Sequence, residues 1–215
     1  LPETSPRQPC GQLSLRPRIS VPAAARQPLL RAAPTMASTW VLGGLMLSIG
    51  GSVLGTLFGE TNHAVVGLVI GSFAAAGASA SVVLRDLPPR RMARIGTMTL
   101  IVGVTLFVIG LAATSLPVFA LSAVVAGAGF GPGFLGAFRE VSLLAEPHER
   151  AGLVSAIFAV SYLAFSIPAL IAGIAITQVG LRPTALVYGV VVGAIALATF
   201  GHESYAMRRR AKVGE

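Results

Sequence analysis

The sequence predicts an all-α membrane protein with six transmembrane helices, and three observations lead to this prediction. The chain of 215 residues is 54% hydrophobic and only 11% charged, whereas charged residues make up about 25% of an average soluble domain. Six stretches of 18 to 26 residues contain no Asp, Glu, Lys, Arg or His. The positive charges lie almost entirely between these stretches, on one side. This pattern excludes a water-soluble enzyme and a nucleic-acid-binding domain, although the net charge is +8.

The length of each stretch predicts a membrane-spanning helix. A hydrocarbon core about 30 Å thick requires about 20 helical residues, and backbone groups within lipid must be hydrogen-bonded internally. The predicted spans are residues 33–58, 64–84, 95–113, 118–138, 151–176 and 183–200. We expect residues 1–32, rich in Pro, Arg, Gln and Ser, to form a basic, mobile cytoplasmic segment, and residues 201–215 a basic cytoplasmic tail.

The positive charges predict the orientation of the spans. Of the 16 Lys and Arg residues, 15 lie either before the first span or after the second, fourth or sixth span. These positions are all on one side of the membrane, and only Arg182 lies on the other side. We expect the protein to lie in the plasma membrane, and the positive-inside rule then puts both termini in the cytoplasm. The inner loop of residues 139–150 carries both signs of charge, and we expect these charges to pair along the membrane surface.

The spans lack the residues that catalysis requires. Ionisable side chains within a membrane usually mark an ion or proton pathway, and the six stretches contain none. No Ser–His pair, pair of aspartates or metal-ligand set lies within them. We therefore expect no enzyme activity, no metal and no cofactor. If protons drive transport, the titrating carboxylate must lie outside these spans.

Small residues form a row along the first span. Gly44, Ser48, Ser52 and Thr56 are four residues apart and so share one helical face. This face is either a weakly polar wall of a solute pathway or a surface for close helix packing. Trp40 lies near the cytoplasmic end of the same span, where it either contacts solute or anchors the helix at the interface.

Aromatic residues mark the fourth and fifth spans. Phe130, Phe134 and Phe138 recur every four residues within a glycine-rich stretch, and they line either an apolar cavity or a packing surface. Pro132 in this stretch is expected to kink the helix. Tyr162 needs a partner for its hydroxyl in hydrocarbon, so we expect it to point inward, toward either a neighbouring helix or a solute.

The order of the spans and two segments resemble the C-terminal half of a bacterial major facilitator superfamily transporter. The segments are P-H-E-R-A-G-L-V-S-A at residues 147–156 and S-Y-L-A-F-S-I-P-A-L-I-A-G at residues 161–173. The resemblance covers the chain from residue 33 onward, and residues 1–32 resemble the central cytoplasmic loop of that family. It implies six helices arranged as a 3+3 inverted repeat, which is one half of a twelve-span fold.

The resemblance extends to the loop after the second span. Family members have an Asp followed four and five residues later by Arg or Lys, and Asp86, Arg90 and Arg91 match these positions. The two glycines of the family pattern are replaced by Val82 and Pro89. The resemblance implies that the three charged residues act as a cytoplasmic gate latch.

The resemblance also implies a substrate cavity between the first and fourth spans. Trp40, Ser48, Ser52, Phe130 and Phe134 would lie near the solute, and Tyr162 is the further candidate described above. Such an apolar, uncharged cavity suits a small amphipathic or hydrophobic solute, exported by alternating access.

Half a facilitator lacks a complete pathway, so its partners would be the bilayer, the solute and a second six-span unit. That unit is a first half in the same or another polypeptide, or a second copy of this chain. Two other classes stay open. A six-span permease subunit of an ATP-driven transporter would dock its ATPase through the loop of residues 139–150. A membrane scaffold would bind no solute.

Overall fold

The computed structural model describes residues 21–213, and the side chains up to residue 201. Six long helices form this part of the chain, which contains no strand. They are α1 (Ala23–Ser52), which continues into a π-helical turn η1 (Val53–Leu57), α2 (His63–Val83), α3 (Pro89–Ala112), α4 (Leu116–Ser142), α5 (Arg150–Val179) and α6 (Leu181–Val213). All six are long and apolar enough to cross a membrane. The prediction of an all-α chain with six candidate membrane spans is therefore confirmed.

The first helix begins ten residues earlier than the predicted span. Residues 23–32, expected to belong to a mobile segment, form the first turns of α1, and the preceding residues 1–20 of that segment lie outside the described residues. Packing explains the difference, because Leu29 and Met36 are buried in a cluster with Val141 of α4 and Leu153 of α5. Similarly, α6 continues through most of the predicted tail.

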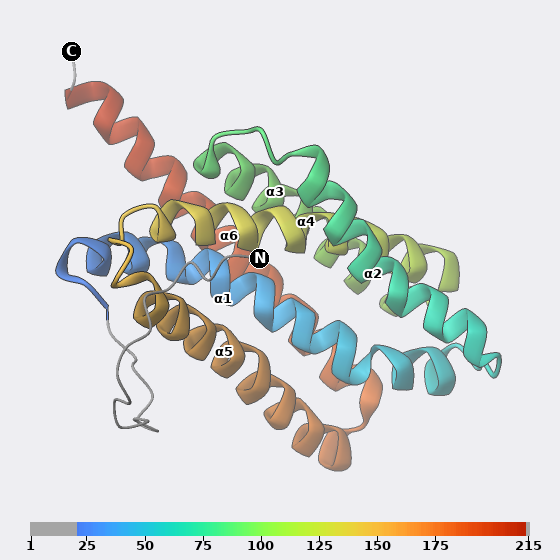
Figure 1. Ribbon diagram of the computed structural model, residues 1–215. Coiled ribbons are helices and arrows are strands. Elements are labelled where there is room, and N and C mark those ends of the chain that lie inside the picture. The colour runs from blue at the N-terminus through green and yellow to red at the C-terminus, as the bar shows by residue number, and fades with distance from the viewer. Residues whose placement is uncertain (1–20, 214–215) are drawn as a thin grey trace, which may run out of the picture.

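Two central helices, α1 and α4, hold the bundle together. The first packs against α4, α5 and α6, and the second against α1, α2 and α3. In Figure 1, α1 runs across the middle of the view with α2 on one side and α5 on the other. Five of the predicted cavity residues lie on these two helices, namely Trp40, Ser48, Ser52, Phe130 and Phe134.

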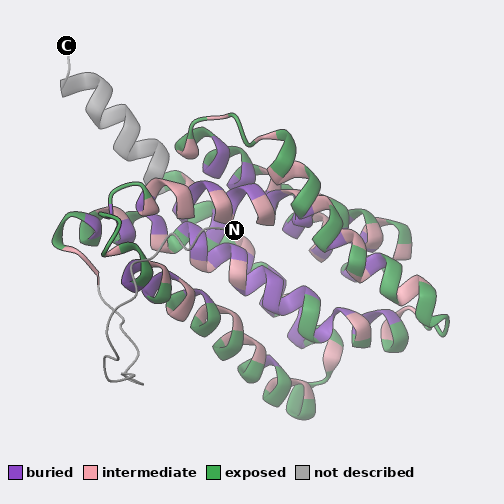
Figure 2. Ribbon diagram, in the orientation of Figure 1, coloured by how far each residue is buried: buried purple, intermediate pink, exposed green. Residues whose placement is uncertain are grey.

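Burial differs strongly among the helices. In the most apolar part of α1, 56% of the residues are buried, against 17% in α2 and in α5. Figure 2 shows the exposed surface of α5 along most of its length. Leu163, Ile167, Leu170 and Ile174 on α5 are all more than half exposed. Apolar faces of this kind suit contact with lipid or with further transmembrane helices.

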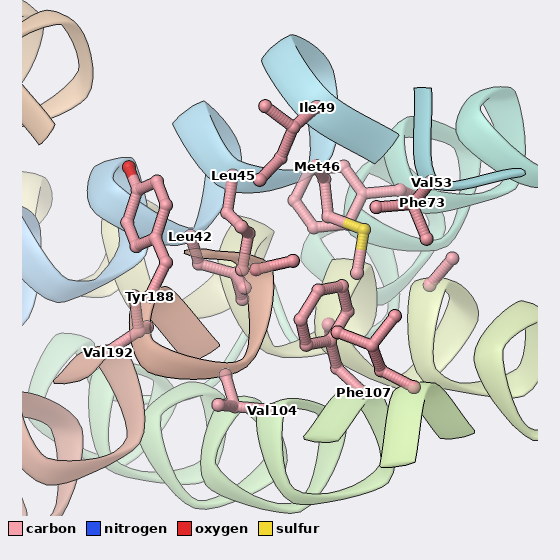
Figure 3. Packing of buried hydrophobic residues seen from close by; sticks show 14 of the residues in the cluster. Leu42, Leu45, Met46, Ile49, Val53, Phe73, Val104, Phe107, Tyr188 and Val192 are labelled. Carbon is pink, nitrogen blue, oxygen red and sulfur yellow. The ribbon is translucent and has the colours of Figure 1, made fainter. Parts of the chain in front are cut away.

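Aliphatic and aromatic side chains from all six helices form the main core, and Figure 3 shows part of it. Leu42, Leu45 and Met46 of α1 lie within it, each at most 3% exposed. The hydroxyl of Tyr188 on α6 donates a hydrogen bond of 3.1 Å to the carbonyl oxygen of Val41 on α1. This contact links the two helices within the core.

Glycines bring α4 into backbone contact with α2 and α3. A Cβ atom added to Gly127 would lie 2.0 Å from the carbonyl oxygen of Phe73 on α2, and one added to Gly96 of α3 would lie 2.1 Å from the amide nitrogen of Gly133. Such distances leave no space for a side chain. We call this contact surface the glycine seam; it consists of Gly77, Gly96, Gly103, Gly110, Gly127, Gly129, Gly131, Gly133 and Gly136.

Candidate functional site

Six aromatic rings meet between α1, α4 and α5, with Trp40 at their centre. The Trp40 ring centroid lies 5.1 Å from that of Tyr162 and 5.4 Å from that of Phe134. Three more rings lie 6.2 to 6.3 Å away. These distances are typical of favourable edge-to-face pairs. We call this group the aromatic cluster; it consists of Trp40, Phe130, Phe134, Phe158, Tyr162 and Phe165.

Helical spacing gathers these rings from three separate segments. Phe130 and Phe134 are four residues apart on α4, while Phe158, Tyr162 and Phe165 are four and three residues apart on α5. Such intervals put side chains on the same helical face. The structure therefore brings together four of the predicted cavity residues, namely Trp40, Phe130, Phe134 and Tyr162.

Two glycines of α1 make room for the cluster. A Cβ atom at Gly43 would lie 3.2 Å from the Phe130 ring, and one at Gly44 would lie 2.9 Å from the carbonyl oxygen of Phe165. Gly44 thus belongs to a close helix contact, as the packing interpretation of the small-residue row predicted. The aromatic cluster rests on the same stretch of α1.

Two polar atoms in this region have no hydrogen-bond partner among the described residues. They are the indole nitrogen Nε1 of Trp40 and the hydroxyl of Ser161 on α5, and both atoms are buried. A buried donor without a partner usually costs about 1–3 kcal/mol, so such a group calls for a partner such as a water molecule or an ion. The cluster therefore combines apolar rings with free hydrogen-bonding capacity.

Tyr162 is more exposed than the sequence predicted. Its ring contacts Trp40 and Phe158, yet 57% of the residue is exposed and its hydroxyl forms no hydrogen bond within the described part of the chain. The Tyr162 ring thus contacts other rings as expected of an inward-pointing residue, whereas its hydroxyl lacks the expected protein partner. Tyr162 forms the open edge of the aromatic cluster.

The serines of the first span lie on an exposed face of α1. Ser48 and Ser52 are both exposed, and the Ser48 hydroxyl donates a hydrogen bond to the carbonyl oxygen of Gly44 within the same helix. Neither serine forms a hydrogen bond with a polar group of the aromatic cluster among the described residues. Their contact with a solute stays a prediction.

The three predicted gate residues form no hydrogen bond or ion pair with one another. Asp86 is almost fully exposed, and its carboxylate lies 3.7 Å from the neighbouring Arg85. Arg90 instead donates a hydrogen bond of 2.7 Å to Glu140 at the end of α4. Arg91 is exposed. The Nη1 atom of Arg139 donates to the carbonyl oxygen of Arg85 at 2.7 Å, so α4 holds this loop in place.

Sequence reasoning missed Phe158, Phe165 and the buried Ser161. Their spacing relative to Tyr162 is the signal that could have found the two rings, because all three share a face of α5. Comparison of the chain with protein-family models, curated proteins and solved structures found no match. The geometry of the site must therefore carry the functional argument.

Proposed function

We propose that this chain is the C-terminal six-helix half of a transporter of the major facilitator type, which moves a small amphipathic or hydrophobic solute across the plasma membrane by alternating access. The aromatic cluster is the observation that carries this proposal. Its rings would stack against the apolar body of a solute, and the indole N–H of Trp40, which has no partner among the described residues, would donate to a polar group of that solute.

The pattern of helix contacts supports a repeat of three helices. When α1, α2 and α3 are matched with α4, α5 and α6, the contact of α1 with α5 corresponds to that of α4 with α2. The contact of α3 with α4 corresponds in the same way to that of α6 with α1. Further close pairs are α1 with α4, α3 with α6, and α5 with α6. Exchange of α1, α2 and α3 for α4, α5 and α6 preserves each of these contacts except the one between α5 and α6, which has no comparable counterpart between α2 and α3. Inverted repeats of three helices produce this kind of pattern.

The exposed apolar faces of α2 and α5 support a second six-span unit. Only 17% of the most apolar part of each helix is buried within this chain. We propose that a first half, in the same or another polypeptide, or a second copy covers part of these faces. Both termini of the chain would then lie in the cytoplasm, on the arginine-rich side.

The composition of the cluster supports an uncharged or weakly polar binding surface. Its six side chains include no carboxylate or amine, and its two hydrogen-bonding groups are the Tyr162 hydroxyl and the Trp40 indole N–H. A sugar or a dicarboxylate would require several more polar partners than these. An amphipathic molecule with a flat apolar part requires only the rings and one or two hydrogen bonds.

Trp40 is the single tryptophan of the chain, so its fluorescence reports directly on the aromatic cluster. We would titrate the full chain in nanodiscs with tetraphenylphosphonium, a hydrophobic cation, and with naphthalene sulfonate, an amphipathic anion. Saturable quenching by at least one probe is expected, and glucose should produce none. Tyr162→Ala should weaken binding about tenfold, which corresponds to about 1.4 kcal/mol.

Leu163→Ala is the matched control, because Leu163 is 56% exposed on the same turn of α5 and lies outside the cluster. This variant should bind the probes as the unmodified chain does. Absence of quenching by both probes would contradict the proposal and favour a membrane scaffold. Equal affinity in Tyr162→Ala would remove the cluster from the binding site.

A further inference from the structure

A pocket with a volume of about 300 Å³ lies between the end of α4 and the beginning of α5, at the arginine-rich end of the bundle. Its lining comes from the α4 side through Phe138, Arg139, Ser142 and Leu143, and from the α5 side through Arg150, Leu153 and Val154. The pocket therefore combines two guanidinium groups and a hydroxyl with an aliphatic wall. None of these polar groups belongs to the aromatic cluster.

The two arginines carry positive charge that the described part of the chain does not neutralise. Arg139 uses Nη1 for the carbonyl oxygen of Arg85, and Arg150 uses Nε for the carbonyl oxygen of Ala145 at 3.3 Å. Neither arginine forms an ion pair with a described carboxylate, although the sequence predicted charge pairing in this loop. The remaining N–H groups of both guanidiniums stay available for an anion.

Two of the three acidic residues in this loop have other partners, whereas Glu149, which precedes Arg150, forms no ion pair with a described residue. Glu140 forms its ion pair with Arg90 of α3, and Glu146 lies 3.5 Å from the imidazole of His148. These contacts direct both carboxylates toward other groups. An anion that enters the pocket would thus contact two arginines without displacing an existing ion pair.

Ser142 supplies an independent observation. Its hydroxyl oxygen is buried and has no hydrogen-bond partner among the described residues, although it lines the pocket. The first turn of α5 also lines the pocket through Arg150 and Leu153. The N-terminus of a helix carries partial positive charge and favours bound anions. The free hydroxyl, the helix terminus and the arginines all suit the same type of ligand.

We propose that this pocket binds a phosphate group. Arginine matches the geometry of phosphate oxygens through paired N–H donors, and basic pockets between transmembrane helices at a membrane surface bind lipid headgroups. The aliphatic wall and the neighbouring Leu143, which is 68% exposed, would accommodate the acyl chain of an anionic phospholipid. A soluble phosphate ester would use the same donors but would leave the wall in contact with water.

The test compares these two sources of phosphate on the full chain. Protein in neutral detergent would receive phosphatidylglycerol, phosphatidylcholine, or sodium phosphate with sodium sulfate as its ionic control, and its melting temperature would be measured. Phosphatidylglycerol should raise the melting temperature in a saturable manner, whereas phosphatidylcholine should not. A rise with sodium phosphate alone would assign the pocket to a soluble ligand.

Three variants make the test specific. Arg150→Gln should weaken phosphatidylglycerol binding about tenfold, as expected for the loss of a charge-assisted hydrogen bond. Arg91→Gln is the matched control, because it removes the same charge from an exposed position at the same end of the bundle, outside the pocket lining. Ser142→Ala should reduce the lipid-dependent rise while leaving the melting temperature of the lipid-free protein unchanged or higher.

Two results would overturn the proposal. One is the absence of any saturable shift with phosphatidylglycerol and sodium phosphate. The other is an equal shift in Arg150→Gln and Arg91→Gln, which would show that the lipid responds to net charge rather than to the pocket. Should Arg150→Gln fail to fold, an undiminished shift in Ser142→Ala would contradict the proposal in the same way.

Discussion

Two surfaces of α4 contact their neighbours in different ways. On the glycine seam, the backbone of α4 meets the backbones of α2 and α3. A Cβ atom at Gly127 of α4 would overlap with α2, and one at Gly96 of α3 would overlap with α4. At the aromatic cluster, Phe130 and Phe134 of the same helix reach α1 and α5 through their rings, with centroids 5.4 to 6.2 Å from that of Trp40.

This difference separates a rigid part of the bundle from an adjustable one. Backbone contact permits little displacement, since any added volume forces the helices apart. Ring contacts can change through side-chain rotation, whereas α2, although no more buried than α5, is held by backbone contact at Gly127 and Gly131. We therefore expect α2, α3 and α4 to behave as one unit and α5 to be the more easily displaced helix.

The largest effect is expected on the glycine seam. Gly127→Ala would put a Cβ atom 2.0 Å from the carbonyl oxygen of Phe73, so we expect a destabilisation of about 3 kcal/mol, at the upper end for overpacked sites. Unfolding of the purified protein in sodium dodecyl sulfate would measure it. Gly71→Ala on α2 is the control, because no atom lies within 4 Å of its added Cβ. Equal stability of the two variants would refute the seam as a close contact.

A smaller effect is expected at the aromatic cluster. Phe158 contacts the rings of Trp40, Phe134 and Tyr162, and Phe158→Ala should destabilise the protein by about 2 kcal/mol. This lies below the 3–5 kcal/mol typical of fully buried Phe→Ala changes, since the ring is only partly buried. Limited proteolysis should also detect a looser α5. The exposed Leu170 on the same helix provides the control Leu170→Ala, which should change neither measurement.

The helices were predictable from the sequence because charge-free stretches of bilayer length have few other structural solutions. The early start of α1 was not, since Arg26 and Arg31 interrupt the apolar pattern there. Those turns form because Leu29 packs against residues of α4 and α5, more than 100 positions away in the chain. Such long-range contacts leave no mark in the local pattern.

The candidate site was predictable only in part for a similar reason. Trp40, Phe130, Phe134 and Tyr162 stood out individually, but their meeting depends on the order in which helices pack. The pairing of Arg90 with Glu140 was not foreseen, because long charged side chains near loops have several partners of similar energy.

A hydrogen bond gives a third kind of helix contact, with a smaller effect than either surface of α4. Tyr188→Phe removes the donor to the carbonyl oxygen of Val41 while keeping the ring in the core. We expect a loss of about 0.6 kcal/mol, the average for hydrogen bonds between transmembrane helices. The unfolding assay described for Gly127→Ala measures it. A loss as large as that of Phe158→Ala would contradict the ranking of backbone, ring and hydrogen-bond contacts.

The smallest effect is expected from the ion pair between Arg90 and Glu140, which lies at the arginine-rich end of the α3–α4 contact. The pair is short, at 2.7 Å, but the Arg90 side chain is 66% exposed, and solvent weakens such pairs to roughly 0.2–1 kcal/mol. A double-mutant cycle with Arg90→Gln and Glu140→Gln should give a coupling energy below about 0.5 kcal/mol that decreases further in high salt. If the glycine seam fixes α3 against α4, both single variants should remain folded and monodisperse. A coupling above about 2 kcal/mol would mean that the ion pair, rather than backbone contact, holds these two helices together.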